Sequence, residues 1–184
     1  MYLKWIVCDV KKDKIHEFSV AQQKWDQVAV AEGFIVQFGG WNVKNKLEAC
    51  ILSVWNHKYD LDNFMKDLHD QIFENNNQLE TYNSICVDHF HVESETDSKA
   101  TVEMIKKSKD LIVFDYLFKS ESIGNINTIP KFKTPCIIGK NENNKSRLLV
   151  IDFIDQIDIN LDNIEIEKVE KKQILLVDSW KVCS

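Results

Sequence analysis

Two runs of this sequence predict β-strands that are apolar on both faces, and this property limits the possible folds more than any other. Side chains alternate across a strand. In the run at residues 2–10, six apolar residues divide between the faces: Leu3, Trp5 and Val7 against Ile6, Cys8 and Val10. The run at residues 48–56 shows the same pattern. Two helices can cover only one face of such a sheet. The other face must therefore meet a second sheet, about 10 Å away, from a later part of the chain or from another copy.

Hydrophobic periodicity predicts the elements of the first 92 residues. In chain order they are a strand at 2–10, a helix at 13–31, strands at 34–41 and 48–56, a helix at 60–75 and a strand at 81–92. Apolar residues recur at three- and four-residue steps within both helices. Gly33 ends the first helix, and Asp60 or Asp62 can cap the second. The order β-α-β-β-α-β is that of a ferredoxin-like unit.

Later parts of the chain resemble earlier ones. The turn "GWNVKNK" at 40–46 is similar to "GKNENNK" at 139–145, and "ICVDHFHVES" at 85–94 is similar to "LLVDSWKVCS" at 175–184. The spacing between matched segments shrinks along the chain, so the second copy would keep its strands and lose its helices. The alternative is chance similarity among apolar strands joined by turns rich in Asn and Lys.

The predicted fold class is therefore α+β, with two ferredoxin-like halves closed face to face into a barrel within one chain. The first half would span residues 1–94, the degenerate second half 109–184, and a linker 95–108. Such a chain would be a monomeric pseudo-dimer, and a homodimer of it remains an alternative.

Two adjacent glycines, Gly39 and Gly40, interrupt a predicted strand just before Trp41. Glycine permits the positive φ of a bulge, and it also leaves room where another backbone approaches closely. Gly40 has a counterpart in Gly139, whereas Ile138 stands where Gly39 would repeat. The pattern predicts a corner at the same place in each half.

Composition excludes several classes of partner. The net charge is −6, and no basic cluster is longer than Lys-Lys. Nucleic acids and acidic membrane surfaces both require dense positive charge, so neither is expected as a partner. The first apolar run ends at Asp9, so it predicts neither a signal peptide nor a spanning helix. Five cysteines without C-x-x-C spacing predict reduced, buried thiols in a cytoplasmic protein.

Four short motifs suggest a family. The start "KWIVC", the helix segment "AQQKW", the pair "GGW" and the helix segment "HDQIF" resemble the dimeric α+β barrel superfamily of antibiotic-biosynthesis-monooxygenase-like proteins. Within it, the sequence is most similar to the uncharacterised bacterial YdbC-like family. The first 92 residues carry the resemblance. It implies a small-molecule site between the second helix and the sheet.

The same resemblance bears on haem. Haem-degrading members combine an asparagine on the first strand with a tryptophan and a histidine on the second helix. Here Phe64 stands where that tryptophan would be, and the first strand has no asparagine. A haem site is therefore ranked below an unspecified small-molecule site, and no cofactor is predicted.

His69 is the candidate catalytic residue. At 100° per residue it lies about 80° from Leu61, at the shoulder of the apolar stripe of its helix. From there an imidazole could serve as a general base or bind haem iron. The alternative is a partly buried histidine whose ring nitrogens are satisfied by Asp70, Asp67 or the backbone.

Four further residues complete the predicted ligand site: Gln37, Trp41, Trp55 and Phe64. Gln37 needs a hydrogen-bond partner if it is buried in its apolar strand. Trp5 and Trp25 are further candidates for an aromatic ligand wall, but core packing is the favoured alternative for both. His89 and His91 share one face of a strand and could begin a metal site, but no third ligand is evident and no metal is predicted.

Two functions follow from this set of residues. The first is a cofactor-poor, monooxygenase-like enzyme that holds an electron-rich substrate in a dry cavity. The second is a non-catalytic ligand-binding or stress-response module that uses the same cleft. Sequence motifs for nucleotide binding and for the common hydrolases are absent.

Overall fold

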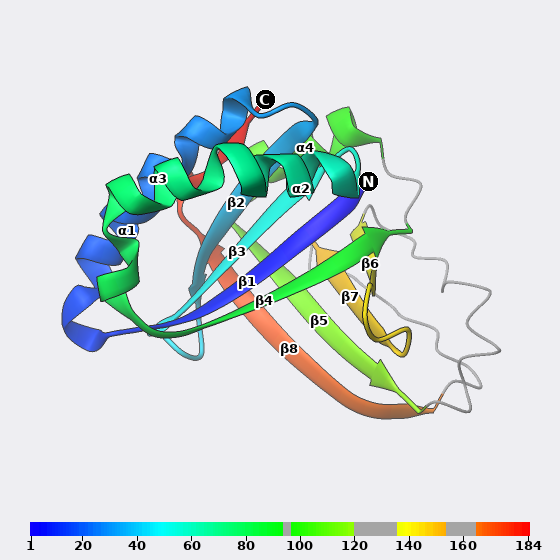
Figure 1. Ribbon diagram of the computed structural model, residues 1–184. Helices are drawn as coiled ribbons and strands as arrows, with labels where there is room; N and C mark the ends of the chain where they lie inside the picture. The colour runs from blue at the N-terminus through cyan, green and yellow to red at the C-terminus, as the bar shows by residue number, and fades with distance from the viewer. Residues whose placement is uncertain (94–96, 120–135, 154–164) are drawn as a thin grey trace.

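Eight antiparallel strands close into a barrel in the computed structural model of this chain, which describes residues 1–93, 97–119, 136–153 and 165–184 (Figure 1). The strands are β1 (Tyr2–Val10), β2 (Phe34–Asn42), β3 (Glu48–Trp55), β4 (Tyr82–Val92), β5 (Asp110–Phe118), β6 (Cys136–Asn141), β7 (Arg147–Asp152) and β8 (Ile166–Leu176). Around the barrel the order is β1-β4-β6-β7-β5-β8-β2-β3, and β3 returns to β1. A short strand, β9 (Val182–Cys183), also pairs with β2. The predicted α+β class is confirmed.

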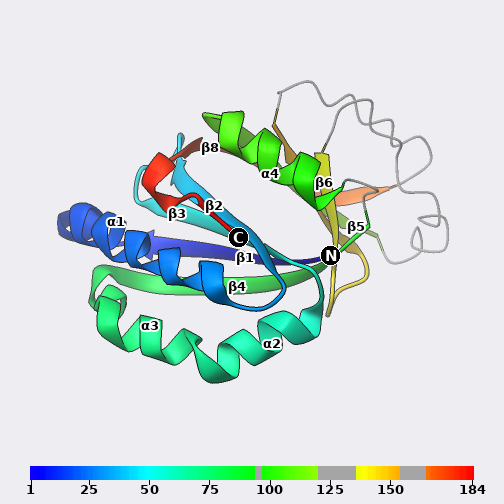
Figure 2. The ribbon, with the colours of Figure 1, turned by 90° about the horizontal axis from the view of Figure 1, so that it is seen from above.

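A helical layer covers the outer face of strands β1 to β4 (Figure 2). It consists of α1 (Ile15–Gln23), a 3₁₀ stretch η2 (Lys24–Val30), α2 (Lys58–Asp67) and α3 (His69–Asn76). Three short 3₁₀ turns are η1 (Lys12–Lys14), η3 (Gln78–Thr81) and η5 (Asp178–Trp180). The predicted helix at 13–31 is thus α-helical only as far as Gln23. None of the helices in the described ranges has the length and apolar content needed to cross a bilayer.

Gly33 ends the first helical segment as predicted. Its φ is +72°, a left-handed conformation that favours glycine. A Cβ there would lie 2.1 Å from Cγ of Asp60, the buried residue at the start of α2. The Asp60 carboxylate accepts a hydrogen bond from the backbone N–H of His57, which caps that helix. The turn at Gly33, which ends the first helical segment, therefore packs against Asp60 at the start of α2.

Both apolar faces of the N-terminal strands are buried, as predicted. Leu3 and Trp5 belong to the cluster that fills the barrel, whereas Cys8 and Val10 pack with Phe18 of α1 under the helical layer. The second covering layer is supplied by β5 to β8 of the same chain. The sequence argument from two-faced strands is therefore confirmed.

The predicted linker at 95–108 contains a helix. Residues 95 and 96 lie outside the described ranges, and α4 (Ser98–Lys107) occupies the rest. Thr101 and Ile105, four residues apart, are both fully buried, and Ile105 packs into the cluster inside the barrel. The predicted loss of helices later in the chain concerns residues 120–135 and 154–164, which lie outside the described residues.

Two short seams join the N-terminal strands to the C-terminal ones. Strand β2 meets β8 through three residue pairs, with Gly40 opposite Leu176, and β4 meets β6 through three, with Gly139 opposite Val92. A Cβ on Gly40 would lie 1.9 Å from the carbonyl oxygen of Leu175, and one on Gly139 would lie 2.7 Å from Cβ of Phe90. Neither glycine has a positive φ. Close approach of the Leu175 backbone explains Gly40, and close approach of the Phe90 side chain explains Gly139, so neither glycine marks a bulge.

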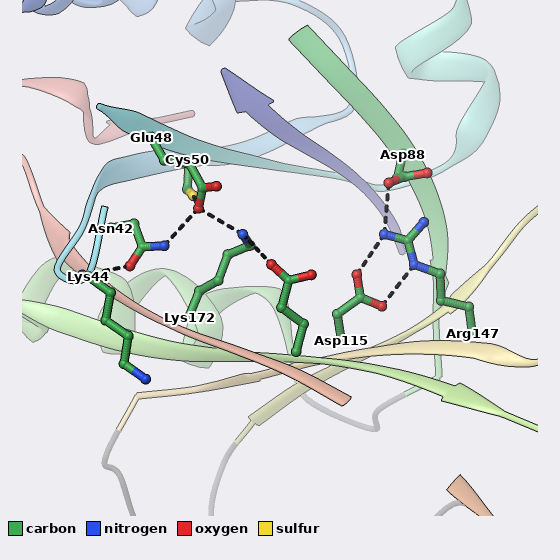
Figure 3. Close-up of polar contacts among 9 residues, drawn as sticks. Asn42, Lys44, Glu48, Cys50, Asp88, Asp115, Arg147 and Lys172 are labelled. Atoms are coloured by element: carbon green, nitrogen blue, oxygen red, sulfur yellow. Dashed lines mark hydrogen bonds and ion pairs between the residues drawn. The ribbon is translucent and has the colours of Figure 1, made fainter. Parts of the chain in front are cut away.

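Ion pairs inside the barrel hold the strands from the two parts of the chain in register (Figure 3). Arg147 of β7 donates two hydrogen bonds to Asp115 of β5, at 2.8 and 2.6 Å, and lies 2.9 Å from Asp88 of β4. Lys172 of β8 donates to Glu48 of β3 at 2.8 Å. The carboxylate of Asp115, through its hydrogen bonds, raises the pKa of Arg147 above its ordinary value. Each network crosses between the two parts of the chain.

Candidate functional site

A cavity of about 490 Å³ lies between the outer face of β1 to β4 and the helical layer. Its volume falls within the range of small-molecule sites. The walls are mainly apolar and aromatic, and they include Trp25, Val28, Trp55, Leu61, Phe64 and Phe73. Ile85 and Val87 of β4 and Met65 of α2 also line it, and they are 48%, 41% and 36% exposed. These three residues mark the mouth of the cavity.

A row of four polar side chains crosses the floor of this cavity. Cross-strand pairing places His89 of β4 opposite Lys4 of β1, Lys4 opposite Ser53 of β3, and Ser53 opposite Gln37 of β2. All four line the cavity. Directly opposed residues on neighbouring strands have Cβ atoms about 5 Å apart. The four side chains therefore form one continuous polar strip across a mainly apolar chamber.

Lys4 is the most unusual member of the row. Its residue is only 8% exposed, and the hydrogen bond of its ammonium group goes to the thioether sulfur of Met65, at 3.5 Å. A thioether is a weak acceptor. No carboxylate in the described part of the chain pairs with it. Burial lowers the pKa of Lys4 from 10.5 to about 8.

Gln37 and Ser53 add hydrogen-bond donors to the strip. The side-chain nitrogen of Gln37 is buried and has no partner among the described residues. Ser53 accepts a hydrogen bond from the indole N–H of Trp55 at 3.0 Å, so its own O–H remains able to donate. The sequence predicted that a buried Gln37 would need a hydrogen-bond partner. In the structure Gln37 is buried, its amide nitrogen has no protein partner among the described residues, and the residue lines the cavity.

His89 lies at the other end of the row. Burial, and then the charge of Lys4, lower the pKa of His89 below its ordinary value, which favours the neutral imidazole. The ring of Tyr2 stacks on His89 at 5.8 Å and meets His91 edge-on at 5.1 Å. The described residues contain no group of three or more potential metal ligands. The two histidines frame a tyrosine ring.

His69, the first residue of α3, lies in the cavity wall. Its ring contacts Trp25, Phe64 and Phe73 at centroid distances of 5.3, 5.8 and 5.9 Å. Its Nδ1 lies 2.9 Å from a carboxylate oxygen of Asp70. The position matches the prediction of a residue on the shoulder of the helix, and the Asp70 contact matches the structural alternative.

The structure brings together four of the five predicted site residues. Gln37, Trp55, Phe64 and His69 line the cavity, but Trp41 does not. The Trp41 ring packs on Phe18 and on Trp180, at 5.7 and 5.4 Å. Trp41 shares a face of β2 with Gln37 but lies farther along the strand, where Trp180 of the C-terminal segment fills the space under α1. The prediction that Trp41 lines the site is therefore wrong.

Several site residues were not predicted. Trp25, expected in the core, lines the cavity and donates a 2.7 Å hydrogen bond to Gln78. Lys4 was missed altogether, although a signal existed. It falls on the same strand face as Ile6 and Cys8, the face that the helices had to cover, and a lysine on a covered apolar face needs a reason to be there.

Comparisons with known proteins agree with the fold and name no activity for this chain. Residues 2–90 match a family model described as a domain of unknown function (DUF4937). Solved structures of proposed monooxygenases from Lactobacillus acidophilus and Fusobacterium nucleatum superimpose with TM-scores of 0.68 for both, at 10% and 12% identity. The first superposition covers 99% of this chain and 95% of the Lactobacillus protein, and the second covers 95% of this chain and 91% of the Fusobacterium protein. An anthrone oxidase-like protein superimposes with a TM-score of 0.58 at 10% identity, over 96% of this chain and 91% of its own. The fold is therefore shared with these structures.

The N-terminal strands and helices carry the sequence similarity. The uncharacterised protein YdbC of Bacillus subtilis is 37% identical over 89 residues, which make up 47% of this chain and 75% of the relative. Residues 2–90, the segment that matches the family model, contain all four members of the polar row and the residues that line the cavity. The chain therefore belongs to the family of the Bacillus subtilis protein YdbC.

Proposed function

We propose that this protein binds a flat, mainly apolar small molecule in the cavity between the helical layer and β1 to β4. The observation that supports this most strongly is the state of the polar row. Buried polar groups are normally hydrogen-bonded, and leaving one unpaired costs free energy. Lys4 and Gln37 both lack a strong partner and face a chamber of ligand size. A ligand with oxygen atoms would supply what they lack.

We further propose that the bound molecule is oxidised by O₂ without a cofactor, as a monooxygenase-like reaction. The superimposed monooxygenase-like structures support this choice of chemistry. With anthrone as the model substrate, one atom of O₂ would become the new carbonyl oxygen. The other would leave as water with the two methylene hydrogens, so the substrate itself supplies the electrons. His69 in the cavity wall is the candidate base, and neither haem nor metal is part of the proposal.

The second candidate function is ligand binding without catalysis, for example in a stress response. The surroundings of His69 favour it. Its ring is enclosed by three aromatic side chains and its Nδ1 is occupied by Asp70. These contacts give His69 a packing role in the cavity wall that does not require it to act as a base.

A titration with anthrone tests the binding function. Quenching of tryptophan fluorescence under anaerobic conditions should report binding, because Trp25 and Trp55 line the cavity. Val87→Trp, at the mouth, should raise the Kd at least about tenfold by blocking entry. Val169→Trp is the matched control, because Val169 is an equally exposed valine on β8, at 50%, and does not line the cavity. Unchanged binding by Val87→Trp would contradict the proposed site.

An oxygen electrode then separates the two functions. For the enzyme, anthrone should consume O₂ faster than its spontaneous oxidation, the rate should resist EDTA, and Val87→Trp should lose the excess. The protein should show no Soret band during this reaction. Binding without O₂ uptake would establish the non-catalytic function instead.

We also propose that the chain consists of two ferredoxin-like halves, 1–94 and 109–184, which act as a pseudo-dimer. The pairing order supports this, because β2-β3-β1-β4 in the first half corresponds to β6-β7-β5-β8 in the second. Gly40 and Gly139 then occupy equivalent places at the two seams. Their equivalence is open to test by substitution.

A further inference from the structure

The polar row also indicates which class of molecule the cavity accepts. Resting on the binding function proposed above, we infer that the ligand is an aromatic oxyanion, a phenolate or an enolate, whose ionised oxygen contacts the ammonium group of Lys4. A second oxygen at the far side of the aromatic system accepts a hydrogen bond from Gln37. The structural similarity to monooxygenase-like proteins does not by itself specify this arrangement. It follows from the charge, burial and spacing of the row.

The buried charge of the cavity is one-sided. Lys4 is the only lysine or arginine among the residues that line it. The only carboxylate in the lining, Asp62, belongs to an exposed residue of α2. A buried ammonium group is normally paired with an anion. Because no such anion comes from the described protein, the missing counter-ion is assigned to the ligand.

The spacing of the row sets a length for the ligand. Gln37 and Lys4 lie on β2 and β1, with β3 between them. Adjacent strands are about 4.8 Å apart, so the two backbones are separated by about 10 Å. A ligand of one or two aromatic rings fits between them. The side chains of Lys4 and Gln37 would then contact oxygen atoms at its two ends. Ser53, midway along the row, can donate to the ionised oxygen as well.

The walls suit an aromatic framework. Trp55 and Phe64 pack at 5.1 Å in the cavity lining, and Trp25 and Phe73 face it near His69. Aromatic side chains favour offset or edge-on contact with a ligand ring. Apolar walls also strengthen the attraction between an ammonium group and an oxyanion, because they exclude water.

Other ionisable groups share the cavity and must be kept in view when pH is varied. Those that line it with Lys4 are Cys8 of β1, Tyr82 and His89 of β4, Asp62 of α2 and His69 of α3. Burial raises the pKa of Cys8 to about 12 and also raises that of Tyr82. Both groups are therefore neutral near pH 7, and neither supplies a negative charge that would compete with an anionic ligand for Lys4.

A pair of nitroaromatic probes tests the inference. 4-Nitrophenol carries an acidic hydroxyl opposite a nitro group, and its yellow phenolate is visible by absorbance. 4-Nitroanisole has a similar shape but cannot ionise. The wild-type protein at pH 7 should bind 4-nitrophenol about tenfold more tightly than 4-nitroanisole, and binding should lower the pKa of 4-nitrophenol by about one unit. Lys4→Met should remove both effects and leave the affinity for 4-nitroanisole unchanged.

Two further variants keep the result interpretable. Lys46→Met removes an exposed lysine in the turn between β2 and β3, outside the cavity, and should behave like the wild type. Gln37→Leu should weaken both probes equally, about threefold, because both carry the nitro group that it would contact. Its preference for 4-nitrophenol should persist.

The outcomes are distinct. If Lys4→Met weakens both probes equally, or if the wild type shows no preference for the ionisable probe, the inferred oxyanion contact is wrong while the cavity remains a binding site. If neither probe quenches tryptophan fluorescence and anthrone also fails to bind, the proposed function fails with it. Circular dichroism of each variant confirms that its fold is retained.

Discussion

Lys4→Met should make the protein more stable at pH 7 by about 3 kcal/mol. Lys4 is buried without a carboxylate partner, and its pKa falls from 10.5 to about 8 in the folded state. That shift of about two and a half units corresponds to about 3 kcal/mol against folding while the lysine is protonated. Methionine has a similar length and no charge. Urea denaturation of both proteins at pH 7 measures the difference.

The gain should depend on pH in a defined direction. Between pH 8 and pH 10.5 the unfolded lysine holds a proton that the folded one has lost, so the stability of the wild type rises with pH in this window. The advantage of Lys4→Met should therefore shrink to about 1 kcal/mol at pH 10. Other lysines and tyrosines titrate equally in both proteins and cancel. Equal stability at pH 7, or a gain that persists at pH 10, would show that Lys4 is not buried as an unpaired cation.

A residue that destabilises the fold calls for a functional explanation. Sites that bind and react often retain unfavourable groups that substitution would relieve. The expected result for Lys4→Met joins the two lines of argument, because the same variant should gain stability and lose the preference for the ionisable probe.

Gly40→Ala should destabilise the protein by about 3 kcal/mol, the upper range for forcing atoms into a packed site. The new Cβ would lie 1.9 Å from the carbonyl oxygen of Leu175, and backbone atoms cannot move aside as a flexible side chain can. The seam between β2 and β8 has three residue pairs and would have to open. Urea denaturation measures the loss, and Val43→Ala, at an exposed position three residues later, is the control.

The pseudo-dimer proposal adds an expectation for the other seam. Gly139→Ala should also be destabilising, because its Cβ would lie 2.7 Å from Cβ of Phe90. Light scattering should give a mass of 21.5 kDa, that of one chain, for the wild type. A Gly40→Ala loss below about 1 kcal/mol would contradict the description of a barrel closed within a single chain. A wild-type dimer would favour the alternative of a homodimer of closed barrels.

The sequence predicted the strands well because local chemistry determines them. Runs such as residues 2–10 and 34–41 combine β-branched and aromatic residues between turn residues, and the strands begin and end within one residue of the prediction. The apolar character of both faces of β1 led directly to a second covering layer. Helix 60–75 was predicted as one unit but is divided into α2 and α3 at Leu68. Backbone hydrogen bonds nevertheless continue through Leu68, from Phe64 to Ile72. The periodicity of apolar residues predicts the buried face that α2 and α3 share, but it does not predict the break between them at Leu68.

The candidate site was predicted only in part, because its defining feature joins distant strands. His89, Lys4, Ser53 and Gln37 become neighbours only through pairing register, which the sequence did not specify. Trp41 was misplaced because Trp180, 139 positions later by subtraction of the two numbers, occupies the space beside it. Lys4 was the one residue that could have been found, since a lysine on a covered strand face is an exception to ordinary burial.

A crystal structure of the complex with 4-nitrophenol is the most direct test that an aromatic oxyanion binds on Lys4. The ring should lie between the helical layer and β1 to β4, against Phe64 and Trp55, with the phenolate oxygen within hydrogen-bond distance of Nζ of Lys4 and the nitro group toward Gln37. Arg147 is a competing cation in the described part of the chain, and it lines a smaller cavity of about 220 Å³ together with Lys168 and Asp115. Density for the probe at Arg147, or a phenolate oxygen turned toward the cavity mouth, would contradict the account.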